Sequence, residues 1–135
     1  MAGVVATVAM SAVMLALREQ LGEAPPDAIA GATARAAGAD PTEHETDAPA
    51  VQLHLTFGAG TGGAYALLPR TGAPVLRGTV TALAVWATAY QGWVPALGIL
   101  PPASREAPQR VRVMVLAHVV YGAVLGLVED ALPRR

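Results

Sequence analysis

The chain has 135 residues, of which 53% are hydrophobic and 14% are charged, whereas charged residues make up roughly 25% of an ordinary soluble domain. All of its basic residues are arginine and its net charge is −1, so no basic surface argues for binding to nucleic acid. Cysteine is absent, which excludes disulfides, thiolate metal sites and thiol catalysis.

Four stretches of the chain contain no charged side chain: residues 1–17, 48–69, 78–104 and 113–128. A helix that crosses the hydrocarbon core of a bilayer needs about 20 mainly apolar residues. A helix of a soluble bundle would carry charged residues along one face, and these stretches have none. The sequence therefore predicts four transmembrane helices rather than a soluble bundle.

The first predicted helix covers residues 2–18 and ends before the pair Pro25-Pro26, which stops a helix. A cleaved signal peptide is the alternative for this stretch. No Lys or Arg lies in the first 17 residues, so the basic segment that begins a signal peptide is missing and we expect a retained helix. Residues 19–47 form a long loop, in which the alanine-rich residues 28–37 could form a short surface helix.

The other predicted helices cover residues 49–68, 78–94 and 110–129. A tight link joins the second helix to the third, with Gly72 and Pro74 as turn residues. Pro95 marks either a kink in the third helix or its end. Glu129 and Asp130 lie at the end of the fourth helix, where we expect both carboxylates to be solvated.

An internal repeat relates the two halves of the chain. With a shift of 64 positions, residues 54–70 (HLTFGAGTG at their start) fall on residues 118–134 (HVVYGAVLG) without a gap. With a shift of 76, residues 21–26 (LGEAPP) fall on residues 97–102 (LGILPP). A polar insertion of 12 residues near positions 38–49 accounts for the difference between the shifts. Coincidence in a composition rich in Ala, Gly, Val and Leu is the alternative.

The repeat predicts an all-α, membrane-embedded four-helix bundle made of two tandem parallel two-helix repeats. Residues 1–135 form a single transmembrane domain, with repeat 1 at residues 1–70 and repeat 2 at residues 77–135. Because each unit has an even number of helices, the two share one orientation and are related by a pseudo-two-fold axis along the membrane normal. Both termini then lie on one side of the membrane and the two Pro-Pro loops on the other.

One motif, His-x-x-x-Gly-x-x-x-Gly, occurs in both repeats: His54, Gly58 and Gly62, and His118, Gly122 and Gly126. Residues four apart share one face of a helix. Glycines at this spacing let two membrane helices approach closely, because no Cβ holds the backbones apart. The motif therefore predicts helix-packing faces, and the second and fourth helices could meet there across the pseudo-two-fold axis.

Two histidines at similar depth also suggest a cofactor site. Neutral imidazole is a common ligand of haem and transition metals, and polar groups within a membrane are usually functional. An interhelical hydrogen bond is the interpretation we favour, because His54 and His118 supply fewer ligands than a zinc site needs and no Asp, Glu or Cys lies near them in the apolar stretches. We expect no cofactor, with haem or metal at this pair as the alternative.

The segment from Ala117 to Gly126 (AHVVYGAVLG) resembles a motif of the YagU-like family of small, uncharacterised bacterial inner-membrane proteins. The resemblance covers the third and fourth helices and the loop between them. Because no chemistry is assigned to that family, the resemblance implies a location in the inner membrane and no activity.

We expect a non-enzymatic integral membrane protein that contacts the lipid bilayer and acts through helix packing, as a homo-oligomer or as a partner of another membrane protein. One alternative is a protein that binds haem, a metal or a small lipophilic ligand at the histidine pair. A second alternative is an oligomeric minimal transporter or channel. The arginines are nearly balanced between the two sides, and the excess of acids on the long-loop side favours cytoplasmic termini.

Overall fold

The computed structural model of the chain describes residues 1–21, 25–36, 38 and 43–133. Its regular secondary structure is all-helical over these residues, which confirms the all-α part of the predicted fold class. In chain order the elements are α1 (Ala2–Ala16), α2 (Arg18–Leu21), α3 (Pro25–Ala36), α4 (Glu43–Ala66), α5 (Pro74–Thr88), the π-helix η1 (Ala89–Trp93), α6 (Val94–Ala96), the 3₁₀-helix η2 (Ala103–Arg105) and α7 (Pro108–Ala131).

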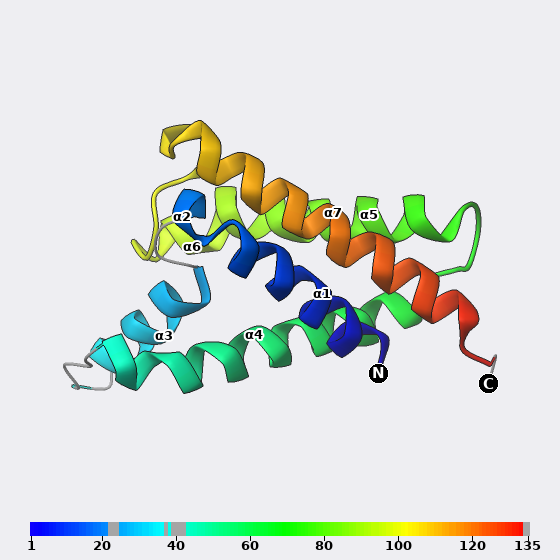
Figure 1. The fold of residues 1–135 in the computed structure, drawn as a ribbon, viewed down its shortest axis with the longest axis horizontal. Coiled ribbons are helices and arrows are strands. Elements are labelled where there is room, and N and C mark those ends of the chain that lie inside the picture. Colours follow the sequence, from blue (N-terminus) through cyan, green and yellow to red (C-terminus); the bar gives the residue numbers. More distant parts are fainter. Residues whose placement is uncertain (22–24, 37, 39–42, 134–135) are drawn as a thin grey trace.

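The long helices α1, α4, α5 and α7 lie lengthwise beside one another (Figure 1). The amino terminus, the link from α4 to α5 and the end of α7 lie at one end of the bundle. The connections that follow α1 and α5 lie at the other end, where the short helices α2, α3 and α6 are found.

The principal contacts join α5 with α7, and α1 with both α7 and α4, while α3 packs against α4. Packing of the second and fourth predicted helices mainly against each other is therefore not observed in the described part of the chain. Instead, each histidine-containing helix packs against the apolar helix that precedes it in the same half of the chain: α4 packs against α1, and α7 packs against α5.

The start of α4 differs from the prediction. The helix begins at Glu43 instead of residue 49 and contains Pro49 in its interior. Acidic residues suit the first turns of a helix as well as a loop, because the amino-terminal end of the helix dipole is positive. Much of the predicted insertion at residues 38–49 is thus helical, while residues 39–42 lie outside the described part of the chain.

Proline begins two of the long helices. The start of α5 is Pro74, which the sequence analysis assigned to the turn, and the start of α7 is Pro108. The fixed φ of proline suits the first helical position, and its missing N–H would have no partner there in any case. The turn itself is made by Gly72, whose φ of +78° lies in the left-handed region.

The helix that contains Pro95 is distorted before this proline and ends shortly after it. The helix widens into a π turn over Ala89–Trp93, returns to α geometry in Val94–Ala96 and ends at Leu97. Proline has no N–H to donate to the preceding turn, so the regular bonding pattern fails near it. Gly98, with φ of +69°, then redirects the chain.

Glu129 is buried, contrary to the expectation that it is solvated. Its residue is 8% exposed, and its carboxylate accepts a hydrogen bond from the Arg70 guanidinium at 2.9 Å. Asp130 is exposed as expected. The reversal of the chain after α4 brings Arg70 to the end of α7, which local sequence does not show; Arg134, the repeat counterpart of Arg70, lies outside the described residues.

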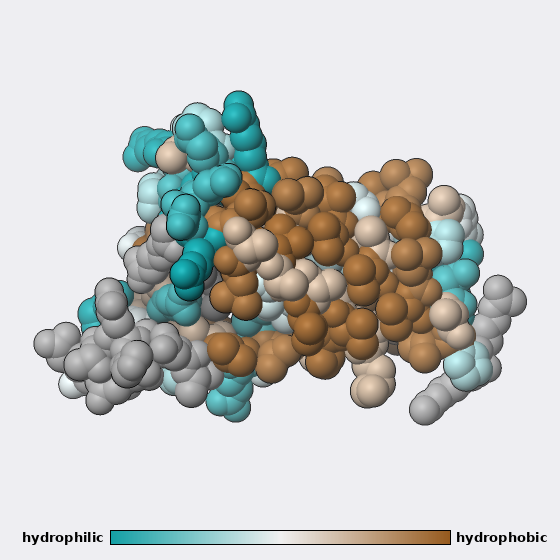
Figure 2. Space-filling view, viewed as in Figure 1, coloured by the Kyte–Doolittle hydropathy of each residue, from teal (hydrophilic) through white to brown (hydrophobic). Residues whose placement is uncertain are grey.

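Among the described residues, α7 is the one helix long and apolar enough to cross a bilayer by itself. The helix α1 is apolar but has 15 residues. A buried core helix of a soluble protein passes the same test, so length and composition alone are weak grounds for a membrane location. Figure 2 adds that apolar residues form a broad band over the middle of the bundle on the face shown, and that polar residues gather at its two ends.

Candidate functional site

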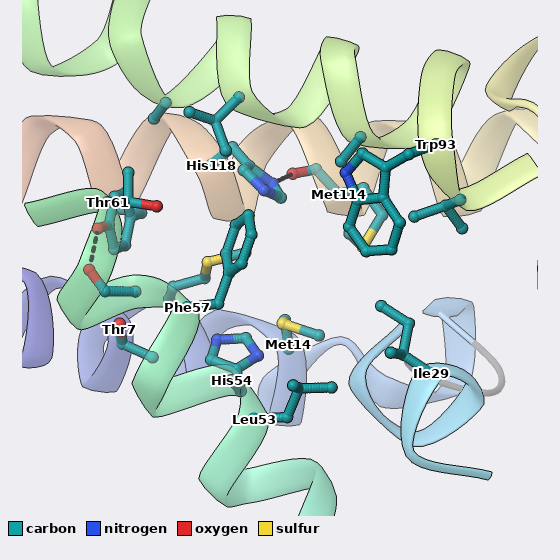
Figure 3. A pocket seen from close by; sticks show the side chains of 17 residues that line it. Thr7, Met14, Ile29, Leu53, His54, Phe57, Thr61, Trp93, Met114 and His118 are labelled. Carbon is teal, nitrogen blue, oxygen red and sulfur yellow. Dashed lines mark hydrogen bonds between the residues drawn. The ribbon is translucent and has the colours of Figure 1, made fainter. Parts of the chain in front are cut away.

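A half-open cavity of about 160 Å³ lies between α1, α3, α4, α5 and α7. Both histidines of the predicted pair line it, His54 from α4 and His118 from α7 (Figure 3). Ile29 of α3 and Trp93 of η1 also belong to its wall. The lining is almost entirely apolar, and none of its residues in the described part of the chain is an acid, an arginine or a cysteine.

The ring of His118 is oriented by its own helix. Its Nδ1 lies 2.8 Å from the backbone carbonyl oxygen of Met114, one turn earlier. A carbonyl only accepts hydrogen bonds, so Nδ1 carries the proton and Nε2 keeps its lone pair. The ring also lies 6.3 Å from the ring of Trp86, measured between centroids. This arrangement leaves Nε2 available to a ligand.

His54 enters the cavity from the opposite wall (Figure 3). In this view the Phe57 side chain lies between the two imidazole rings, and Met14 lies beside His54. Phe57 is 50% exposed, so its ring is not locked in place by packing. The two histidines therefore line one cavity from different helices.

The first pair of motif glycines seats α1 on α4. A Cβ added at Gly58 would collide with the side chain of Thr7, and one added at Gly62 would collide with the backbone of Gly3. The hydroxyl of Thr7 is turned back onto its own helix, where it donates to the Gly3 carbonyl at 2.7 Å. The backbones of α1 and α4 consequently approach within the space that a methyl group would need.

The second pair of motif glycines seats α5 on α7 in the same way. A Cβ at Gly122 would collide with the backbone of Gly78, and one at Gly126 would collide with the carbonyl of Pro74. The sequence analysis missed the partner glycines Gly3 and Gly78. The sequence did offer one indication of these partners, because each lies near the start of the first helix in its half of the chain.

Polar contacts close the bundle at the end that carries the long connections. The Arg110 side chain donates from Nη1 to the Leu21 carbonyl at 2.9 Å and from Nε to the Tyr90 hydroxyl at 3.1 Å. Glu106 lies 3.5 Å from Arg110 Nε and accepts a hydrogen bond from Tyr90 at 3.3 Å. At the other end, Arg77 Nε donates to the Tyr65 hydroxyl at 2.7 Å. These contacts were not predicted. Except for the i,i+4 pair of Glu106 and Arg110, they join residues that are far apart in the sequence.

The fold and the site define a small helical bundle that contains an apolar cavity with two imidazoles. A family model matches the chain over residues 1–135, and the chain belongs to DUF6789, a family of unknown function. The match agrees with the expectation of an uncharacterised family, and the more specific YagU-like assignment is not confirmed. No curated protein and no solved structure matches the chain.

Proposed function

We propose that this protein is a non-enzymatic, multi-pass membrane protein that binds a small ligand in the cavity between His54 and His118. The observation that carries the proposal is the meeting of both imidazoles at one apolar cavity of about 160 Å³. An apolar cavity of about 150 Å³ accommodates benzene or xenon. This volume favours a small molecule or a metal ion over a haem.

The bilayer is the proposed environment because apolar side chains cover the outside of the bundle. Val8, Leu15 and Leu116, for example, are 60%, 69% and 46% exposed, and Figure 2 shows a broad apolar band over the middle of the bundle. Soluble monomers rarely expose contiguous apolar patches larger than a few hundred Å². Contact with lipid acyl chains would remove this surface from water.

The third span is longer than its separate elements suggest. The elements α5, η1 and α6 follow one another without a gap, so residues 74–96 form one helical rod. At ~1.5 Å per residue the rod is about 34 Å long, compared with roughly 30 Å for the hydrocarbon core of a bilayer. The four proposed spans are this rod and the helices α1, α4 and α7, of which α1, with 15 residues, is the shortest.

We further propose that the four spans are two tandem parallel units, residues 1–70 and 77–135. Equivalent contacts support this division, since Gly3 packs against the glycine motif of α4 and Gly78 packs against that of α7. The proposed location is the bacterial inner membrane, with both termini in the cytoplasm.

A role as a packing subunit has less support than ligand binding. The four motif glycines are in contact with other helices of the same chain, so they present no free packing face to a partner. Self-association through another surface remains compatible with the proposal.

The test is whether the purified protein retains a molecule or ion in the cavity. Native mass spectrometry would compare the wild-type protein with Ala89→Phe, which places a large ring in the cavity lining. The matched control is Ala87→Phe, at an exposed position two residues earlier. We expect an adduct on the wild-type protein and on the control, and its loss from Ala89→Phe. An adduct that persists in Ala89→Phe, or a wild-type protein without one, would contradict the proposal.

A further inference from the structure

Methionine is concentrated at the cavity. The chain has four methionines, and three of them line this space: Met10 and Met14 from α1, and Met114 from α7. All three are buried, with exposed fractions of 7%, 8% and 4%. Methionine commonly fills irregular gaps in a core. Here every methionine except Met1 contributes to the wall that also holds both imidazoles.

This combination of donor groups is chemically selective. Thioethers are soft ligands that favour Cu(I), and imidazole binds copper as well. Calcium and magnesium require oxygen ligands, which this lining offers only as hydroxyls and backbone carbonyls. A structural zinc site requires four ligands that usually include thiolates or several histidines. The neutral donors and apolar wall also disfavour a divalent ion, because the cost of burying an ion rises with the square of its charge.

Two of the donor groups are already coupled by the fold. The carbonyl of Met114 accepts the Nδ1 proton of His118, which leaves Nε2 as the ligand atom, while the Met114 side chain lines the same cavity. Metal-binding histidines generally donate their second ring nitrogen to such a partner. Met14 of α1 and His54 of α4 line the same cavity (Figure 3). Both imidazoles thus share the cavity wall with methionines.

We propose that the cavity binds one Cu(I) ion through imidazole nitrogens and thioether sulfurs. The ligands are drawn from the five donor residues of the lining, His54, His118, Met10, Met14 and Met114. For the ion to contact both imidazoles, the half-exposed ring of Phe57, which lies between them in the view of Figure 3, has to turn aside. The long, flexible methionine side chains allow the sulfurs to converge on the ion. This inference rests on the proposed ligand-binding function and names its ligand.

The experiment uses the full-length protein in detergent, with Ag(I) as a redox-inert probe and with Cu(I) under anaerobic conditions in competition with a chromophoric chelator. The test variant is the triple substitution Met10→Leu, Met14→Leu and Met114→Leu, which removes the sulfurs and nearly conserves volume. The control is Leu125→Met, a reciprocal exchange at a buried position of α7 outside the cavity lining. Binding is read from stoichiometry, from the change in melting temperature and from quenching of tryptophan emission, since Trp93 lines the cavity and Trp86 lies beside His118.

We expect one Ag(I) or Cu(I) per wild-type chain, quenched tryptophan emission and no comparable binding of Zn(II). Removing a residue that only hydrogen-bonds to a metal ligand lowers metal affinity roughly 10- to 100-fold. The triple variant loses the proposed ligands themselves, so its affinity should fall by more than this. The control should bind like the wild-type protein. The triple variant is folded if its melting temperature without metal is close to that of the wild-type protein. If the triple variant is not folded, the single variant Met14→Leu is used in its place, and this substitution should weaken binding about tenfold.

Wild-type protein that binds neither Ag(I) nor Cu(I), or a folded methionine variant with wild-type affinity, would overturn the Cu(I) site. Zn(II) binding as tight as Ag(I) binding would do the same. If the native protein nevertheless carries an organic adduct that Ala89→Phe removes, the ligand-binding function stands and the metal assignment alone fails.

Discussion

The hydroxyl of Tyr121 donates a hydrogen bond to the carbonyl oxygen of Gly58, with 2.7 Å between the two oxygens. This bond joins α7 to α4 at the wall of the cavity, since both residues line it. Tyr121 precedes a motif glycine of α7, and Gly58 is a motif glycine of α4. The contact therefore ties together the two histidine-containing helices, which otherwise meet mainly through α1.

Replacing Tyr121 by Phe keeps the ring and removes this bond. We expect a loss of stability of about 0.6 kcal/mol, the average for hydrogen bonds between membrane helices. The measurement is reversible unfolding in mixed micelles. Exposed Thr88→Val serves as a control, because its hydroxyl bonds only within its own helix, to the Ala84 carbonyl. Unchanged stability of Tyr121→Phe would show that the bond does not hold α7 against α4.

Alanine substitutions at the glycines should fall into two groups. Gly58→Ala and Gly122→Ala place a methyl group against a neighbouring helix, and overpacking of this kind costs ~1–3 kcal/mol. Gly60→Ala and Gly63→Ala, on the open side of α4, should be neutral or stabilising by up to about 1 kcal/mol, because alanine is the better helix former. Thermal unfolding of the four variants measures the difference. Equal effects at all four positions would rule out the close contacts.

The partly buried pair of Arg70 and Glu129 should contribute measurably to stability. Glu129→Gln leaves the guanidinium of Arg70 without its anionic partner, and loss of one member of a fully buried pair costs ~3–5 kcal/mol. The side chains here are 22% and 11% exposed, so we expect a smaller cost, about 1–2 kcal/mol after solvent screening. Asp130→Asn is the matched control at the exposed neighbouring position. A double-mutant cycle with Arg70→Gln should show that the two effects are not additive.

The absence of native cysteine allows a direct test of the proposed membrane topology. Single cysteines at Gln20 and Ser104, both exposed, should react with an impermeant maleimide from one side of the membrane, and a cysteine at Thr71 from the other. A cysteine at Leu116 should react from neither side in membranes, although its side chain is 46% exposed. Labelling of Ser104 and Thr71 from the same side would contradict the two-helix unit, and fast labelling of Leu116 would contradict burial in lipid.

The sequence alone determined where most helices lie and which of their faces carry glycine. The predicted helix at residues 110–129 corresponds to α7 at Pro108–Ala131, and the predicted helix at residues 2–18 corresponds to α1 at Ala2–Ala16. These features depend on neighbours along the chain, because uncharged stretches and i, i+4 spacing are local properties. The local rules failed at Pro74 and before Pro49, where the same residue types are compatible with a turn or a helix.

Only the tertiary structure decided what those faces meet. It placed α1 on α4 and α5 on α7, buried Glu129 against Arg70, and brought Met14 and Met114 to one cavity from positions a hundred residues apart. No local pattern contains this information, because the helices are apolar on all sides and hydrophobicity alone does not select a partner. The partner is selected by close packing of particular surfaces, here of glycine against glycine, and the same packing determines which side chains share the cavity.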